Sequence, residues 1–551
     1  MLPTLLLLAC ATLVVQLVHA ADGVSNPSLL LRPAYHILPS TGWANDPNGM
    51  FHYLGVYHVF YQHNPRSAEW GGPIAWAHAA STDLAHWTRL PLALQPGPEP
   101  YDADGVFSGS VTVVDGHPRL LYTCVSRRAE LSYFYQQQCE ATPRNASDPM
   151  LVEWVKSKSN PLPMDPPSGG SHAQWRDPSP AWWDGPGQRW RMLIGAQVAC
   201  RGAAALYESR SFANWSFAGL FAAQQDGGAS SPGAACSQFG DAPGGGRAWE
   251  TPGAFQLGSD SGDPSPASTW WLTYGDQASA RQPFAQQFYQ LGRLSSRAAF
   301  VASSPPRLLD GGEVYAAQSF QDGARRRLLL AWAQETPPAA HRGWQGVLTL
   351  PRVLGLSPDG QALTQHPAPE LQLLRAPAAP VYAAPAALSG APAALPMATS
   401  ASRGMQREVE LSFRCPLQSC AAGILLLHSA LGVSGPRTRV TLQLSSGRGM
   451  LVVDRTHTVA GVGTGPYDSC PQQAAFTPAF TPSANRTLRL RLFVDHSILE
   501  AFTGDGLAVV TSRVYPALTQ KGATPWELAL FGNGATDADV RVWELGSAYV
   551  V

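Results

Sequence analysis

Short apolar and aromatic runs recur along almost the whole chain, and Gly, Pro, Asn or Asp separates each run from the next. Residues 50–62 break at the Leu-Gly pair 54–55, and residues 105–125 break at the Asp-Gly pair 115–116. Such pairs between two apolar runs are typical of β-hairpins. Since no long segment carries a helical apolar period, the pattern predicts an all-β fold, either a propeller or a set of sandwiches.

A change in composition divides the chain near its last third. Residues 376–400 are dominated by Ala and Pro and lack charged side chains, which is typical of a linker. Beyond it, residues 488–514 hold three strand-like runs separated by short turns, so we expect a β-sandwich over residues 401–549. Asp495 and Glu500 stand beside these turns, and we interpret both as structural residues.

The N-terminus indicates export from the cytosol. Residues 1–20 hold an apolar stretch and end in the Val-His-Ala triplet 18–20, a cleavage pattern typical of a signal peptide. The stretch is shorter than the ~20 apolar residues of a spanning helix, so we expect no membrane anchor. We expect an extracellular, cell wall or vacuolar protein, with candidate N-glycosylation sites at Asn145, Asn214 and Asn485.

The chain has eight cysteines, of which seven remain once a signal peptide containing Cys10 is removed. In an oxidising compartment this number predicts one or more disulfides and at least one free thiol. We expect a bridge that joins Cys470 to Cys415 or to Cys420. No CxxC pair and no His/Cys cluster at zinc spacing occurs, so we expect neither a metal nor a cofactor.

The charge balance bears on the class of ligand. The formal net charge is −1, and no long run of Lys or Arg occurs. The chain therefore lacks the basic surface that binds nucleic acid or anionic membranes, and we expect neither as a partner. A neutral small-molecule ligand fits this balance better.

Three acidic residues stand beside Trp or Arg in short motifs: Asp46 in WANDPNG, Asp177 in WRDP and Glu250 in WETP. Each motif alone is ordinary, since Asp-Pro-Asn-Gly suits a β-turn and Arg-Asp a surface ion pair. Together the three suit cleavage of a sugar bond with retention. One carboxylate attacks the anomeric carbon, a second acid protonates the leaving oxygen, and a third holds the ring hydroxyls.

Polar and aromatic residues downstream of Asp46 support a sugar ligand. Gln62, Trp70, Phe107 and Ser108 supply amide, hydroxyl and ring groups that can bond sugar hydroxyls and stack on sugar rings. The chain has no GxSxG elbow, P-loop, HExxH or dinucleotide-binding glycine motif, so no other catalytic set competes.

The motifs WANDPNG, FSGS, WRDPSP and WETPGAF, in this order and at this spacing, resemble those of glycoside hydrolase family 32. The resemblance covers nearly the whole mature chain and extends to FVDHSILE near the C-terminus. It implies a five-bladed β-propeller at residues 33–375 with the site in its central funnel, followed by a C-terminal β-sandwich.

By motif match, the resemblance implies that Asp46 is the nucleophile, Asp177 the transition-state stabiliser and Glu250 the acid that later acts as base. It also implies a set of residues that line the substrate pocket: Trp43, Asn45, Gln62, Trp70, Phe107, Ser108, Arg176, Asp310 and Trp332.

Two departures from the family pattern concern the substrate. The family's third motif usually reads Glu-Cys-Pro-Asp, but here Glu250 is followed by Thr251, Pro252 and Gly253. In plant-type sucrose cleavers an Asp is followed three residues later by a basic residue, whereas the sequence here places Glu313 after Asp310.

The resemblance thus implies a secreted retaining β-fructofuranosidase that acts on sucrose. A fructan exohydrolase and a fructosyltransferase are alternatives within the family, and a catalytically inactive sugar-binding homologue is an alternative of another class. The sequence gives no indication of the oligomeric state.

Overall fold

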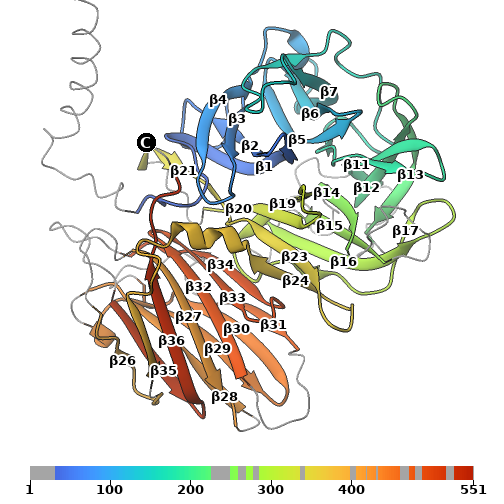
Figure 1. The fold of residues 1–551 in the computed structure, drawn as a ribbon. Coiled ribbons are helices and arrows are strands. Elements are labelled where there is room, and N and C mark those ends of the chain that lie inside the picture. The colour runs from blue at the N-terminus through green and yellow to red at the C-terminus, as the bar shows by residue number, and fades with distance from the viewer. Residues whose placement is uncertain are drawn as a thin grey trace, which may run out of the picture.

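The computed structural model describes residues 31–224, 248–257, 269–276, 285–335, 342–386, 388–397, 405–416, 419–429, 432–458, 471–477, 487–516 and 527–549. The expected signal peptide, Cys470 and Asn485 lie outside these residues. The described chain consists of β-strands and short 3-10 helices, which are η1 (Pro100–Asp102), η3 (Pro369–Leu374) and η4 (Gly432–Ser434). The prediction of an all-β chain is confirmed (Figure 1).

Strands β1 to β24 form five sheets of four or five strands each, which we call the five-sheet part. The first sheet contains β1 (Gly42–Tyr53), β2 (Val56–Asn64), β3 (Ala75–Ser81), β4 (Thr88–Leu94) and the late strand β21 (Trp344–Gln345). The second contains β5 (Gly105–Val114), β6 (His117–Arg127), β7 (Phe134–Pro143) and β8 (Trp154–Lys156). The third contains β9 (Trp175–Arg176), β10 (Trp182–Asp184), β11 (Arg189–Val198), β12 (Arg201–Ser209) and β13 (Ser216–Ala223).

The fourth and fifth sheets complete this part of the molecule. The fourth contains β14 (Trp249–Gln256), β15 (Trp270–Asp276), β16 (Gln286–Leu294), β17 (Phe300–Ala302) and β18 (Arg307–Leu308). The fifth contains β19 (Val314–Gln321), β20 (Arg327–Ala333), β22 (Val347–Leu348), β23 (Arg352–Leu356) and β24 (Leu363–Pro367).

Local turn chemistry explains the hairpins expected from the sequence. Leu54 and Gly55 connect β1 to β2 with φ values of 48° and 82°, and Asp115 and Gly116 connect β5 to β6 with 50° and 79°. Two successive residues with positive φ are characteristic of the type I′ turn, whose twist matches that of the flanking strands.

The first strands of the five sheets lie next to one another at the centre of this part (Figure 1). Strand β1 contacts β5 and β19, β5 contacts β9, and β14 contacts both β11 and β19. In addition, β21 pairs in parallel with β1, which attaches a late segment of the chain to the first sheet. Residues far apart in the sequence are thereby gathered around one centre.

The C-terminal residues form two six-stranded sheets packed face to face, which we call the two-sheet part. One sheet contains β25 (Tyr382–Ala386), β36 (Thr536–Glu544), β27 (Gln406–Arg414), β32 (Thr487–Asp495), β33 (Ile498–Thr503) and β34 (Val509–Arg513). The other contains β26 (Ala393–Ala394), β35 (Glu527–Asn533), β28 (Ser419–Leu427), β29 (Arg437–Ser445), β30 (Arg448–Asp454) and β31 (Gln472–Phe476).

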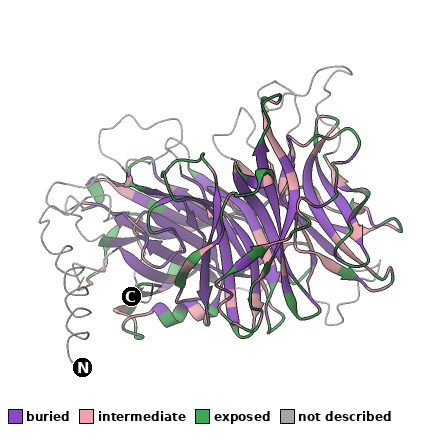
Figure 2. Cartoon of the chain, turned by 90° about the horizontal axis from the view of Figure 1, so that it is seen from above, coloured by how far each residue is buried: buried purple, intermediate pink, exposed green. Residues whose placement is uncertain are grey.

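Buried apolar residues alternate with polar residues along β27, which explains why the two sheets pack against each other. Val409, Leu411 and Phe413 are buried in the core between the sheets, whereas Glu410 and Ser412 lie on the outer face. An antiparallel sheet with one solvated face is expected to alternate in this way. Figure 2 shows buried residues along the strands of both parts of the molecule.

The Ala/Pro-rich segment 376–400 was expected to be a linker. In the structure it supplies β25, which pairs with β36, and β26, which pairs with β35. The segment therefore adds one edge strand to each sheet of the two-sheet part.

The predicted bridge from Cys470 to Cys415 or Cys420 is wrong, because Cys415 and Cys420 are bonded to each other. They lie five residues apart, at the end of β27 and in β28, and this short connection brings their Cα atoms to 5.6 Å, within disulfide range. The bridge joins the two sheets. A second disulfide, Cys124–Cys139, joins the neighbouring strands β6 and β7.

Candidate active site

Bulges in the first strands bring the predicted site residues to the centre of the five-sheet part. The strand register shifts in β1 between Ala44 and Pro47, in β5 between Phe107 and Gly109, in β14 between Glu250 and Gly253, and in β19 between Tyr315 and Gln318. In the third sheet, Asp177 directly follows β9 with a φ of 66°. Bulges and left-handed residues re-aim side chains, and here they occur at or beside each predicted carboxylate.

Asp46 is half-buried in the bulge of β1 and is held by hydrogen bonds at both oxygens. Ser108 Oγ donates to Asp46 Oδ2 at 2.6 Å, and Asn45 Nδ2 donates to Oδ1 at 3.0 Å. The Gln62 side chain donates to Ser108 Oγ and, at 3.5 Å, to Asp46 Oδ2. Trp43 Nε1 in turn donates to Asn45 Oδ1 at 2.8 Å. The carboxylate of Asp46 is therefore fixed in one orientation.

Asp177 is buried between the second and fourth sheets, with 3% of its surface exposed. Its backbone N–H donates to Thr123 Oγ1 at 3.0 Å, and its Oδ2 accepts a hydrogen bond from the backbone N–H of Thr251 at 3.0 Å. Thr123 carries no local signal in the sequence, because it is a Thr in the middle of an apolar strand.

Glu250 is held by an ion pair and by a tyrosine. Arg176 donates through Nε at 2.8 Å and through Nη2 at 2.7 Å to the same oxygen, Glu250 Oε1. Tyr315, from the bulge of β19, donates its hydroxyl to Glu250 Oε2. Arg176 donates these hydrogen bonds to Glu250, and its charge also lowers the pKa of the adjacent Asp177. Tyr315 is a site residue that was not predicted from the sequence.

The three carboxylates influence one another electrostatically. The pKa of Asp46 is raised to about 6, mainly by burial and also by the charge of Glu250, while the hydrogen bond from Ser108 opposes the rise. Burial also raises the pKa of Asp177 to about 8, with Arg176 opposing and with Glu250 and Asp46 contributing. Since each charge acts on the others, the site is one cluster with more carboxylates than cations.

Aromatic residues lie beside this cluster, as the sequence analysis expected. The ring centroids of Trp43 and Trp332 lie 5.6 Å apart in a T-shaped arrangement. Phe107, next to Ser108, lies 6.2 Å from Trp70, and 51% of the Trp70 surface is exposed. An exposed indole next to a polar pocket can stack on the face of a sugar ring.

Comparison with known proteins agrees with this arrangement. Residues 36–367 match the family model of the glycosyl hydrolases family 32 N-terminal domain, and residues 386–544 match that of the family 32 C-terminal domain. The chain belongs to glycosyl hydrolases family 32. It is 30% identical to fructan 6-exohydrolase of Beta vulgaris, with 94% of this chain and 87% of that protein covered. It is 32% identical to the cell wall isozyme of β-fructofuranosidase of Zea mays, with coverages of 94% and 90%.

A solved family 32 structure shares the fold over almost its whole length. The crystal structure of fructan 1-exohydrolase IIa from Cichorium intybus is similar with a TM-score of 0.78 at 26% identity. The similarity covers 95% of this chain and 99% of that chain. A structure of a variant of that enzyme in complex with 1-kestose is similar with a TM-score of 0.77.

The structure explains the altered family 32 motif after Glu250. The residue that replaces the usual Cys is Thr251, whose backbone N–H, not its side chain, bonds Asp177. At the position of the usual Asp stands Gly253, where an added Cβ would lie 2.9 Å from Thr273 Oγ1. The lack of a Cys thiol at position 251 therefore does not affect the hydrogen bond to Asp177. At position 253, a side chain would come close to the Thr273 hydroxyl.

Asp310 does not belong to this cluster, so its assignment to the substrate pocket is wrong. Its Oδ2 accepts hydrogen bonds from Arg352 Nη1 at 3.0 Å and from Thr511 Oγ1 at 2.7 Å. Its Oδ1 accepts from the backbone N–H groups of Gly312 and Thr511. Because Thr511 belongs to β34, Asp310 connects the five-sheet part to the two-sheet part and leaves no oxygen for a sugar.

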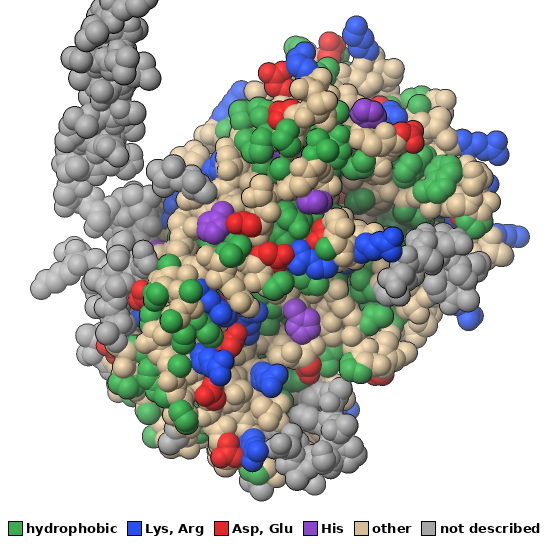
Figure 3. All heavy atoms as spheres, in the orientation of Figure 1, with side chains coloured by type: hydrophobic (Ala, Val, Ile, Leu, Met, Phe, Trp, Pro, Cys, Tyr) green, Lys and Arg blue, Asp and Glu red, His purple; other side chains and the backbone are tan. Residues whose placement is uncertain are grey.

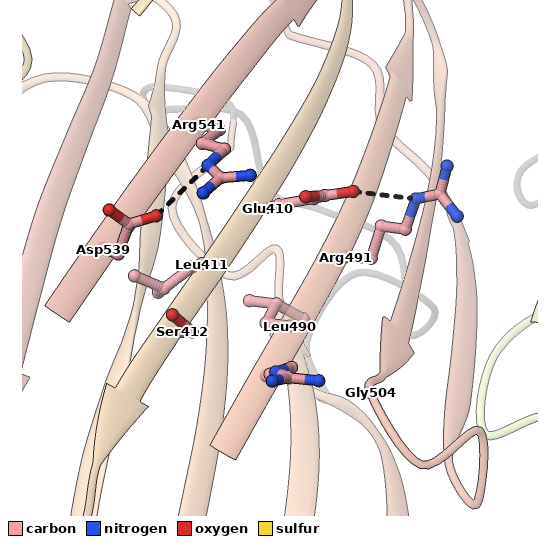
Figure 4. A pocket seen from close by; sticks show the side chains of 9 residues that line it. Glu410, Leu411, Ser412, Leu490, Arg491, Gly504, Asp539 and Arg541 are labelled. Carbon is pink, nitrogen blue, oxygen red and sulfur yellow. Dashed lines mark ion pairs between the residues drawn. The ribbon is translucent and has the colours of Figure 1, made fainter. Parts of the chain in front are cut away.

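A groove of about 370 Å³ on the two-sheet part is another candidate (Figure 4). Its charged side chains pair across the outer sheet face, Arg541 with Asp539 at 3.4 Å and Arg491 with Glu410 at 3.8 Å. Such alternating charges are ordinary on a solvated sheet face, and none of the three clustered carboxylates lines the groove. It therefore has no role in the chemistry of the cluster.

The surface charges, the metal-binding types of side chain and the helices of the described residues add three observations. On the face drawn in Figure 3, acidic and basic side chains are interspersed with neutral and hydrophobic ones. Across the residues that the structure describes, no group of three His, Cys, Asp or Glu side chains is arranged for a metal ion. No helix in the described ranges is long and apolar enough to span a membrane.

Proposed function

We propose that this chain is a retaining glycoside hydrolase that releases terminal β-D-fructofuranosyl residues from sucrose, with fructans as the alternative substrates. The observation that carries the proposal is the convergence of Asp46, Asp177 and Glu250 from three different sheets into one electrostatically coupled cluster. Relatives and structural neighbours are named β-fructofuranosidases and fructan exohydrolases, and one neighbour is in complex with 1-kestose. These names support the same substrate class.

In the first step, the Asp46 carboxylate attacks the anomeric carbon of the fructosyl unit. The bond from that carbon to the leaving oxygen breaks, and Glu250 donates its proton to the leaving oxygen. Ser108 and Asn45 hold the Asp46 oxygens in place, so little reorientation is needed. The product is a fructosyl ester of Asp46 and a free alcohol.

In the second step, the ionised Glu250 takes a proton from water, and the resulting hydroxide oxygen bonds to the anomeric carbon. The ester bond to Asp46 breaks, fructose leaves, and Glu250 is again protonated. Positive charge grows on the ring in both transition states. Asp177, fixed by the backbone N–H of Thr251, stabilises this charge when its carboxyl is ionised.

The fold proposed for the five-sheet part is a five-bladed β-propeller that places the site in its central funnel. Two features support this: the part consists of five separate sheets, and neighbouring sheets contact one another through β1 with β5 and β19, β5 with β9, and β14 with β11 and β19. The propeller then spans residues 33–375, and the sandwich expected at residues 401–549 also includes β25 and β26 of the preceding segment.

An extracellular or cell wall location is part of the proposal, with the vacuole as the alternative. The signal-peptide pattern of residues 1–20 and relatives named as insoluble or cell wall enzymes support export. The substrate would then be a neutral sugar met outside the cytosol. Asn145 and Asn214 are both exposed and stay candidate glycosylation sites, as does Asn485.

Product analysis tests the activity. Sucrose, inulin and levan are each incubated with the enzyme, and we expect free fructose from at least one of them. Longer oligosaccharides as the main products from sucrose would make the chain a transferase. The absence of any product would favour a sugar-binding homologue.

Variants test the roles of the carboxylates. Asp46→Ala removes the nucleophile, and Glu250→Gln removes acid help that contributes about 10²–10⁴-fold. Glu410→Gln, in the groove of Figure 4, is the matched control and keeps full turnover. Unchanged turnover in Asp46→Ala would contradict the assignment.

A further inference from the structure

One buried hydroxyl joins two of the segments that carry the site. Thr123 lies in β6 with no exposed surface. Its Oγ1 donates to the backbone carbonyl of Ser108 at 3.0 Å, with Gln138 Oε1 as a more distant acceptor at 3.4 Å. The same oxygen accepts a hydrogen bond from the backbone N–H of Asp177 at 3.0 Å. This side chain thus connects the bulge of the second sheet to the third sheet.

Both partners of the hydroxyl lie where regular strand pairing is interrupted. Ser108 is the bulged residue of β5, between Phe107 and Gly109, and has no partner in the β5–β6 register. Asp177 has a φ of 66°, which is uncommon for a residue other than glycine. A buried backbone group left without a partner is destabilising, so the Thr123 hydroxyl stabilises both irregular conformations.

We propose that Thr123 is a positioning residue. It fixes the position of Asp46, the nucleophile, relative to Asp177, the stabilising carboxylate. Through Ser108 it acts on Asp46, since Ser108 Oγ lies 2.6 Å from Asp46 Oδ2. Through the backbone it acts on Asp177, whose Oδ2 accepts from the Thr251 N–H at 3.0 Å. The inference rests on the proposed function for its kinetic readouts.

The pH profile separates positioning from a general loss of stability. The acid limb of kcat/KM reports ionisation of the nucleophile in the free enzyme. The hydrogen bond from Ser108 lowers the pKa of Asp46, so a loosened Ser108 moves this limb to higher pH. The other titratable groups that face Asp46 are Glu250 of β14, Asp177 after β9 and Tyr315 of β19, and all three are retained in every variant below.

The test compares Thr123→Val with Thr123→Ser on sucrose or on the fructan that the wild type cleaves. Valine keeps the shape but loses both hydrogen bonds, and we expect kcat to fall about 10- to 100-fold with the acid limb at higher pH. Serine keeps the hydroxyl, so Thr123→Ser is expected to retain both hydrogen bonds together with the wild-type kcat and acid limb. Thr112→Val is the matched control, because Thr112 Oγ1 accepts the Ala181 N–H at 2.8 Å between the same two sheets. It loses stability but keeps the wild-type kcat and pH profile.

The inference would be overturned if Thr123→Val and Thr112→Val had the same kcat and the same acid limb in the pH profile of kcat/KM. Should Thr123→Val not fold, Thr123→Ala removes the same hydroxyl with a smaller side chain. Crystal structures of the variants give a readout that needs no activity. In Thr123→Val the distance from Ser108 Oγ to Asp46 Oδ2 lengthens beyond hydrogen-bonding range, and an unchanged distance contradicts the proposal. A wild type that releases no fructose would refute the proposed function and leave this structural readout intact.

Discussion

Arg352 on β23 and Glu500 on β33 form a fully buried ion pair at 2.6 Å across the junction of the five-sheet and two-sheet parts. A second buried carboxylate, Asp310, lies 3.0 Å from the other terminal nitrogen of the same guanidinium. Thr511 on β34 bonds both Arg352 and Asp310. The two parts are therefore joined by a closed set of charged hydrogen bonds.

Substitution of Arg352→Met is expected to destabilise the protein strongly. It leaves Asp310 and Glu500 buried without their shared cation, and breaking a buried pair in this way costs about 3–5 kcal/mol. The midpoint of urea unfolding, followed by tryptophan fluorescence, measures the loss. Arg541→Met, which breaks the exposed pair with Asp539, is the control and costs under about 1 kcal/mol. Equal losses in the two variants would contradict the prediction.

His36 adds a pH-dependent contact at the same junction. Its Nδ1 lies 2.8 Å from Asp495 Oδ2 and its Nε2 lies 3.1 Å from Glu500 Oε1, so both nitrogens face carboxylates. Burial alone would lower the pKa of His36, but these two hydrogen bonds outweigh it and hold the pKa above 6.5. Although burial acts in the opposite direction, hydrogen bonds and nearby cations hold the pKa values of Asp495 and Glu500 below their ordinary values.

Replacement of His36 by Gln is expected to cost most stability in weak acid. The contribution of His36 is fully present below its unfolded pKa of 6.5 and is lost as pH rises through its higher folded value. We expect the variant to lose about 3 kcal/mol of unfolding free energy at pH 5, and less as the pH rises. Urea unfolding of the wild type and the variant at several pH values measures this difference. His86→Gln, in the exposed pair with Asp83, is the control. A loss of stability that grows as the pH rises would contradict the prediction.

The features that the sequence predicted depend on local chemistry. The hairpin at Asp115 and Gly116 follows from turn preferences of adjacent residues. The surroundings of Asp310 do not, because its partners are set by how distant strands pack. The match to the family motif assigned Asp310 to the substrate pocket, whereas its actual neighbours come from β23 and β34. Tyr315 was overlooked for the same reason, since nothing in its own segment indicates that it faces Glu250.

Tyr315→Phe is expected to lower kcat/KM about 10- to 100-fold, mainly through kcat. The change removes the hydroxyl that holds Glu250, while the ring keeps its packing against Gly275. Steady-state kinetics on the cleaved substrate measure the effect. The control is Tyr57→Phe, which removes a 3.4 Å bond to Asp322 away from the cluster and leaves kcat unchanged. An equal effect of both variants would contradict a specific role for Tyr315.

The cluster of carboxylates reduces the stability of the folded protein, and Asp46→Asn is expected to restore some of it. Burial raises the pKa of Asp46 from 3.8 to about 6, so the folded state favours the protonated form. The stability that protonation gives is full below pH 3.8 and is lost as pH rises through 6. At pH 7 the ionised Asp46 therefore costs on the order of 2 kcal/mol, which the neutral amide avoids.

Thermal unfolding of wild type and Asp46→Asn at pH 4 and pH 7 measures this difference. The variant is expected to have a higher Tm than the wild type at pH 7 and a similar Tm at pH 4, while it is inactive at both. Asp539→Asn, in an exposed pair, shows no such gain. A lower Tm for Asp46→Asn at pH 7 would mean that the hydrogen bonds from Ser108, Asn45 and Gln62 stabilise the carboxylate by more than its burial costs.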